Sequence, residues 1–174
     1  MIARRGHFSD HVVLQKPMNA NRRHIRLTFV NTKESVVAEM LDDEAPGVCN
    51  AVWEMLPIEK KVLNGQYSGA EVFALLDNPK PVPRENLTQL PLPGEILYFY
   101  DDAKYVTNHS GAVAEICVVY GRGVVLRGPE SVPTYCCLFA RIPGDWKYDW
   151  PDFAQACRRA RREGPQILRI ERVS

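Results

Sequence analysis

The segments PGEILYFY (residues 93–100) and VAEICVVY (residues 113–120) decide the fold class of this chain. Apolar residues occupy successive positions in each, and neighbouring side chains of a strand point to opposite faces. A strand with one face in water would alternate apolar and polar residues instead. The two segments therefore predict strands of a sheet that is closed on itself or covered on both sides.

Further strands and two helices are predicted around these segments. Residues 24–30 alternate polar and apolar side chains, 31–33 form a turn and 35–40 return, which predicts a hairpin. One helix is expected over 46–56, with Pro46 in its first turn, and another over 150–163, with Asp149 as its cap. The remaining predicted strands cover residues 60–63, 66–73, 135–142 and 166–173, and residues 124–126 resume the strand over 113–120 after a break at 121–123.

The order of these elements determines the predicted fold class. Seven or eight strands and two helices occur without strict alternation, which argues against a parallel doubly wound sheet. We predict a mostly β fold, an antiparallel barrel or sandwich with helices at its ends. At 174 residues the chain is expected to form one domain over 22–174, preceded by a leader over 1–21 that lacks periodicity.

Composition excludes several classes of function. Residues 27–147 contain ten basic and sixteen acidic side chains, which disfavours nucleic acid as a partner. No apolar run approaches the ~20 residues needed to span a bilayer, and no secretory signal is recognisable, so we expect a cytoplasmic protein. Five scattered cysteines and four histidines show no metal-ligand spacing, and phosphate-loop and dinucleotide motifs are missing. We therefore expect no metal and no cofactor, whereas a homo-oligomer stays open.

Acidic residues among apolar neighbours are the candidates for chemistry. Glu71, Glu95 and Glu115 lie in such surroundings, and a carboxyl that shares a pocket with another can have a raised pKa and act as a general acid or base. The alternative is that these acids face outward and pair with Arg122, Arg127 or Arg141. The proline-rich stretch 77–93 predicts a long surface loop, and a loop of this length is often functional.

We predict that a cleft roofed by this loop forms the site. Glu71 is the candidate catalytic residue. The candidate ligand-binding residues are Trp53, Tyr67, Glu85, Tyr98 and Glu115. The alternative is that the aromatic residues belong to the core and that the acids anchor the loop to the barrel.

Several of these segments together resemble a family. They are DEAP (43–46) followed by Cys49 and Trp53, YSGAEVF (67–73), Glu85-Asn86, PGEILY (93–98) and Glu115-Ile116. The chain is similar, over residues 24–173, to a bacterial family of unassigned function with a cyclophilin-like fold. The resemblance implies a closed barrel of about eight strands with two helices near its openings.

The resemblance leaves two classes of function open. The wider fold includes peptidyl-prolyl isomerases, but their Arg-x-x-x-x-Phe-x-x-Gln-Gly-Gly-Asp and Gly-Ser-Gln-Phe-Phe segments are missing here. It also includes barrel domains in enzyme subunits that act on lactams and urea-like amides. One class is an enzyme or accessory subunit for a small polar molecule with amide or carboxyl groups. The other is a non-catalytic peptide-binding or assembly module, and fold alone does not decide between them.

Overall fold

The computed structural model describes residues 22–102 and 111–173, so the predicted leader lies outside the described part. The nine strands are β1 (His24–Phe29), β2 (Ser35–Met40), β3 (Ile58–Asn64), β4 (Glu71–Leu75), β5 (Leu87–Thr88), β6 (Glu95–Asp101), β7 (Val113–Val119), β8 (Cys136–Arg141) and β9 (Gln166–Arg172). The helices are α1 (Pro46–Met55) and α2 (Pro151–Arg162), and a short 3-10 turn covers Pro129–Ser131.

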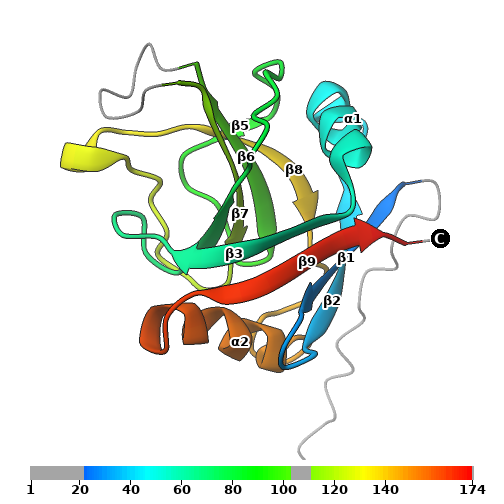
Figure 1. The fold of residues 1–174 in the computed structure, drawn as a ribbon, viewed down its shortest axis with the longest axis vertical. Coiled ribbons are helices and arrows are strands. Elements are labelled where there is room, and N and C mark those ends of the chain that lie inside the picture. Colours follow the sequence, from blue (N-terminus) through cyan, green and yellow to red (C-terminus); the bar gives the residue numbers. More distant parts are fainter. Residues whose placement is uncertain (1–21, 103–110, 174) are drawn as a thin grey trace, which may run out of the picture.

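Eight of the strands close into a ring (Figure 1). The order around it is β2-β1-β9-β3-β4-β7-β6-β8, and pairing of β8 with β2 completes the circle. All pairs are antiparallel, and β5 adds to the outer side of β8 as a ninth strand. The mostly β prediction, a closed antiparallel barrel with two helices, is confirmed.

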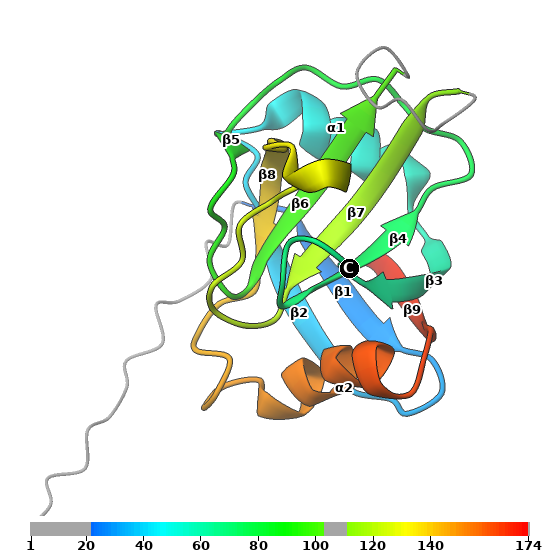
Figure 2. The same ribbon diagram turned by 90° about the vertical axis from the view of Figure 1, so that its left-hand side faces the viewer.

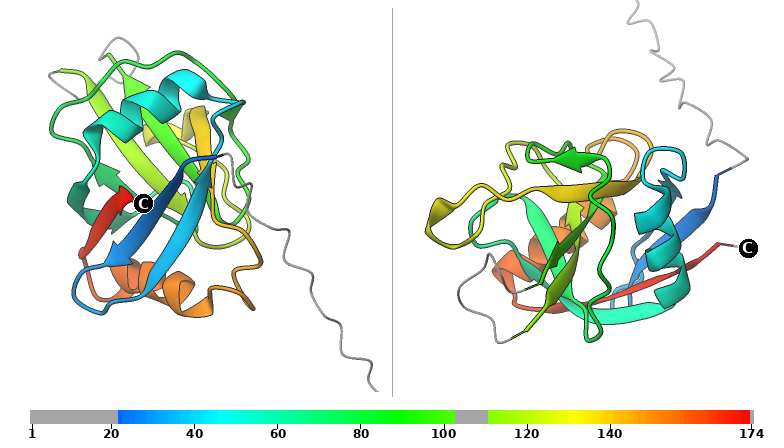
Figure 3. Two further views of the ribbon diagram at one scale, coloured as in Figure 1. Left: turned by 90° about the vertical axis from the view of Figure 1, so that its right-hand side faces the viewer. Right: turned by 90° about the horizontal axis from the view of Figure 1, so that it is seen from above.

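The two helices lie at opposite ends of the barrel (Figures 1 and 3). Each starts at a proline, which lacks the N–H that a first helical turn leaves without an intrahelical partner. Helix α2 turns Phe153, Cys157 and Ala160 into the main core, where the Phe153 ring lies 5.2 Å from that of Phe29. Helix α1 adds Val48, Cys49 and Val52 to the same core. Both helices are therefore held by their apolar faces.

A second, smaller core lies on the outside of the barrel wall. Leu97, Cys117, Val119 and Leu138 face outward from β6, β7 and β8, and Val124 and Leu126 cover them. Figure 2 shows the yellow segment that carries this cover in front of β6 and β7. This cover explains why β6 and β7 are apolar on both faces.

Some local predictions were wrong. Residues 124–126 form no strand but lie across the outer face of the barrel. β4 begins at Glu71 rather than at residue 66, because residues 65–70 form the turn that joins it to β3. Asp149 does not cap α2: Trp150 holds that position, and Asp149 Oδ2 accepts a hydrogen bond from the Asp145 N–H at 2.6 Å.

Candidate functional site

A cavity of about 410 Å³ opens on this outer face. Its floor comes from β4, β6 and β7, one wall from the turn over residues 65–68, and the other wall from residues 126–129 with Thr134 and Cys136. We call it the acid cavity. Its lining side chains include Tyr67, Ser68, Glu71, Phe73, Leu75, Phe99, Glu115, Cys117, Arg127, Thr134 and Cys136.

Strand register brings two acids to the same face. Glu71, Phe73 and Leu75 alternate outward along β4, and Leu75 pairs with Glu115 of β7. Glu115 also pairs with Phe99 of β6, so this carboxyl lies between an aliphatic and an aromatic neighbour. Cross-strand neighbours of this kind have side chains in contact distance. The floor is thus apolar except for its two carboxyl groups.

Glu71 is the most deeply buried acid of the cavity. It is 6% exposed, and its Oε2 atom has no hydrogen-bond partner in the described part of the chain. Burial raises the pKa of this carboxyl, and a hydrogen bond with Ser68 offsets part of the effect. Gly65 makes room for it, because a Cβ built there would lie 2.6 Å from Glu71 Oε1. Glu71 therefore lines the cavity with a carboxyl group of which one buried oxygen has no partner among the described residues.

Glu115 is the second acid. Burial, and then the negative charge of Glu71, raise the pKa of Glu115 to about 7. The Cys117 thiol approaches its Oε2 at 3.9 Å. Among the described residues, 22–102 and 111–173, no ion pair involves Glu71 or Glu115. Two carboxyl groups without a paired cation favour their protonated forms.

The two walls of the acid cavity are tied together. Ser68 Oγ accepts a hydrogen bond from the Arg127 N–H at 3.1 Å. At the base of the turn, Tyr120 Oη donates to Asn64 Oδ1 at 2.6 Å. Tyr67 stands at the rim and is 52% exposed. Hydrogen-bonded loops therefore form the walls around the opening of the acid cavity.

Three of the six predicted site residues line this cavity: Glu71, Glu115 and Tyr67. Tyr98 points into the main core, where its hydroxyl donates to the Lys80 carbonyl at 2.9 Å, and it contributes to a neighbouring hollow. Trp53 and Glu85 do not line the acid cavity.

Trp53 and Glu85 both belong to the surroundings of α1. The Trp53 ring lies between the guanidinium groups of Arg23 and Arg172, 5.2 and 5.0 Å from its centroid. Glu85 Oε2 accepts the N–H groups of Gly47 and Val48 at 2.9 and 3.2 Å. The loop 77–93 therefore anchors to the start of α1 and contributes no residue to the lining of the acid cavity.

Sequence reasoning missed several lining residues. Phe99, Cys117 and Cys136 look like plain core in the sequence, because the strands that carry them are apolar throughout. The usable signal was the alternation Glu115-x-Cys117 beside Glu71-x-Phe73, which places all four on outward faces. Glu95, the third acid considered, accepts a hydrogen bond from Arg141 at 2.9 Å, as the alternative prediction for these acids had it.

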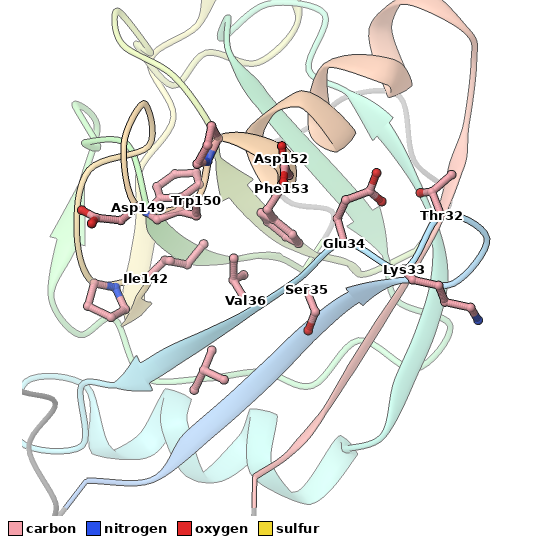
Figure 4. A pocket seen from close by; sticks show the side chains of 13 residues that line it. Thr32, Lys33, Glu34, Ser35, Val36, Ile142, Asp149, Trp150, Asp152 and Phe153 are labelled. Carbon is pink, nitrogen blue, oxygen red and sulfur yellow. The ribbon is translucent and has the colours of Figure 1, made fainter.

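A second hollow, of about 520 Å³, lies between the β1–β2 turn and the start of α2 (Figure 4). Its lining acids are Glu34, Asp149 and Asp152. Glu34 is 2.8 Å from Arg159, which also donates to Thr32 at 2.7 Å. Burial opposes ionisation of Glu34, but the hydrogen bonds from Thr32 and Arg159 keep its pKa below the usual value. Arg159 thus neutralises Glu34, whereas no ion pair of the described residues involves Glu71 or Glu115, so the acid cavity is the candidate site.

Residues 22–102 and 111–173 offer no side-chain group for a metal ion and no membrane-spanning helix. No group of three or more His, Cys, Asp and Glu side chains there could hold a metal ion. No helix in the same residues has the length and apolarity to cross a bilayer. The five cysteines are free and buried.

Fold and cavity define a closed antiparallel barrel with a carboxyl-lined cavity on its outer wall. Residues 27–171 match the model of the family described as "Protein of unknown function (DUF3830)", and the chain belongs to this family. A search of curated proteins found no match.

The solved structures similar to the chain include the following two. One is McbB in complex with tryptophan, with 16% identity and a TM-score of 0.59 over 85% of this chain and 44% of that one. The chain thus spans less than half of McbB, and at this identity the similarity concerns the fold. The other is the hypothetical protein AF2241 from Archaeoglobus fulgidus, with 16% identity, a TM-score of 0.47, and coverage of 87% and 95%.

Proposed function

We propose that the acid cavity binds a small polar molecule through an amide group, with Glu71 and Glu115 as the hydrogen-bonding side chains. The observation that carries this proposal is the Oε2 atom of Glu71, which is buried and unpartnered beside a cavity of ligand size. A buried polar atom without a partner is costly to the fold, so a ligand that satisfies it gains binding energy.

An amide suits this site because of the protonation state that the site favours. A protonated carboxyl offers one O–H donor and one carbonyl acceptor. A primary or cyclic amide offers the complementary C=O and N–H side by side. The apolar floor around Glu115 excludes water from this pair and strengthens both hydrogen bonds.

Glu71 is also the residue we propose for proton transfer, if the bound amide reacts. Its burial raises its pKa, and Glu115, with a pKa of about 7, stands in the same cavity to accept or return the proton. A non-catalytic binding protein would use the same contacts without turnover. The tryptophan complex of McbB supports a small organic ligand as the class of partner for this fold.

The pH dependence of ligand binding distinguishes an amide ligand from a cationic ligand. A thermal-shift screen of small amides, lactams and hydantoins against matched amines should raise the melting temperature with the amides, and more strongly below pH about 7. A ligand present at a hundred times its Kd adds about 2.7 kcal/mol of stability. Binding by amines that strengthens as pH rises would instead assign a cation site.

Variants of Glu71 provide the second test. Glu71→Gln keeps a donor and an acceptor, so we expect amide binding to persist while any proton transfer is lost. Glu71→Leu removes both and should abolish binding. Glu163→Gln, on the exposed end of α2, is the control. If Glu71→Leu binds amides as the unchanged protein does, the site lies elsewhere.

We also make proposals on the fold family, the domain and the location of the protein. We propose that the barrel is cyclophilin-like, that 22–174 forms one domain, and that the protein is cytoplasmic. We expect no prolyl isomerase activity, because the two isomerase signature segments are missing from the sequence. A protease-coupled proline peptide assay measures this, and acceleration at the level of a true cyclophilin would contradict it.

A further inference from the structure

We propose that the amide recognised in the acid cavity carries an aromatic ring or a large apolar group, and that this group occupies a second cavity next to the first. The inference rests on the proposed function and adds the class of ligand. The second cavity measures about 320 Å³. We call it the aromatic cavity, since Tyr100, Tyr135 and Phe99 contribute to its lining.

The two cavities are neighbours and share two lining residues. Phe99 of β6 and Thr134 line both of them. Phe99 pairs with Glu115 across the strands, so the ring that borders one of the carboxyl groups also forms part of the aromatic cavity. A ligand that reaches Glu115 therefore lies against Phe99, and a substituent directed across this ring enters the second cavity.

A short hairpin, residues 127–134, stands between the cavities. Arg127 and Pro133 form a bridge pair, and the Gly128 N–H donates to the Val132 carbonyl at 2.8 Å. Its first half, through Pro129, lines the acid cavity, and its second half, from Val132, lines the aromatic cavity. One structural element thus forms a wall of both compartments, as expected for a single site with two parts.

The surface of the aromatic cavity is of the kind that a ring would cover. Leu87, Val132 and Tyr135 are 42, 57 and 51% exposed, although all three are large and apolar. Covering such side chains with a ligand ring removes apolar area from water on both partners. Arg84, Asp101 and Asp102 also line the aromatic cavity, so the part of it that suits a ring is the surface of Leu87, Val132 and Tyr135. The acid cavity offers carboxyl groups for a polar head, and this surface offers contacts for an apolar substituent.

A matched pair of probes tests the inference. Propanamide presents only the amide head, and hydrocinnamamide is propanamide with a phenyl ring on its terminal carbon. Isothermal titration of the full chain should give a Kd for hydrocinnamamide that is tighter by about tenfold or more, from burial of the ring. The double variant Leu87→Ser with Tyr135→Ser should lose most of this difference and leave the Kd of propanamide unchanged.

Leu92→Ser is the control, because Leu92 is 66% exposed and lines neither cavity. Equal affinity for the two amides in the unchanged protein would overturn the inference, with the proposed function intact. A phenyl advantage that survives in the double variant would also overturn it. If neither amide binds, or if Glu71→Leu leaves the binding of both unchanged, the proposed function itself fails.

Discussion

Glu71 combines a cost to stability with the binding role that we propose for it. Its Oε2 is buried without a partner, and such an atom costs about 1–3 kcal/mol. We predict that Glu71→Leu raises the free energy of unfolding by about 1 kcal/mol or more, because it replaces the unpartnered carboxyl by an apolar group of similar size. The same variant should no longer bind propanamide.

Urea unfolding measures the stability change, and Glu163→Leu is the exposed control. A purely structural carboxyl would give the opposite sign, since its removal would break contacts that hold the fold. A destabilised Glu71→Leu protein would therefore contradict the assignment of Glu71 to a binding site.

Glu115 makes the fold pH-dependent. Its pKa is raised from 4.5 to about 7 in the folded protein, so the folded state favours the protonated form. The stability that this preference provides is fully present below pH about 4.5 and is lost as pH rises through about 7. The difference amounts to at most about 3 kcal/mol at high pH.

Glu115→Gln should remove this dependence, because glutamine does not ionise. Urea unfolding at about pH 5 and about pH 8 tests it: the variant should lose less stability between the two than the unchanged protein does. An identical loss in both proteins would show that Glu115 ionises in the folded state as it does in the unfolded chain.

At the scale of elements, the loop 77–93 supports α1. Ala45, the residue that precedes α1, has a methyl side chain that cannot accept a hydrogen bond from the helix. Glu85 supplies this acceptor for two of the first N–H groups of α1. A carboxylate at a helix start also interacts favourably with the helix dipole. We expect Glu85→Ala to lower the free energy of unfolding by about 1 kcal/mol. Arg84→Ala is the neighbouring control, and equal stability of the two variants would contradict the capping role.

Local sequence patterns predict most of the strands and both helices. The hairpin of β1 and β2 followed from alternation and its turn, and both helices followed from a proline start and an apolar stripe. Residues 124–126 were misassigned because apolar residues that cover a sheet look the same in sequence as those within one. Trp150 displaced Asp149 from the cap because the side chain of Asp149 is bonded to the preceding turn instead.

The site was harder to predict than the elements. Glu71 and Glu115 line the same cavity because β4 pairs with β7, an association of residues more than forty positions apart that no local pattern encodes. Glu85 looked equally suitable, since it too is an acid held between prolines. Only the path of its loop, toward α1 and away from β7, separates it from the other two.

At the scale of the whole molecule, the barrel is closed at a narrow seam. β2 and β8 share only two register pairs, Glu39 with Arg141 and Met40 with Ala140, whereas β6 and β7 share six. Short pairings open locally at lower free energy. We predict that amides at the seam, such as Leu41 N–H, which is bonded to the Phe139 carbonyl at 2.7 Å, exchange with solvent faster than those between β6 and β7.

Native-state hydrogen exchange measures this directly for each amide. Uniform protection around the ring would contradict the prediction and show that the barrel opens only by global unfolding.

The alternation of inward and outward side chains on β4, β6 and β7 separates two tasks within the same strands. Val72, Ala74 and Ile116 fill the barrel, while Glu71 and Glu115 line the acid cavity from positions directly beside them. Substitution at outward positions can therefore change what is bound without repacking the interior. Proteins with this barrel can therefore evolve new ligand preferences through single substitutions at outward positions. A protein engineer can change the specificity of the cavity in the same way.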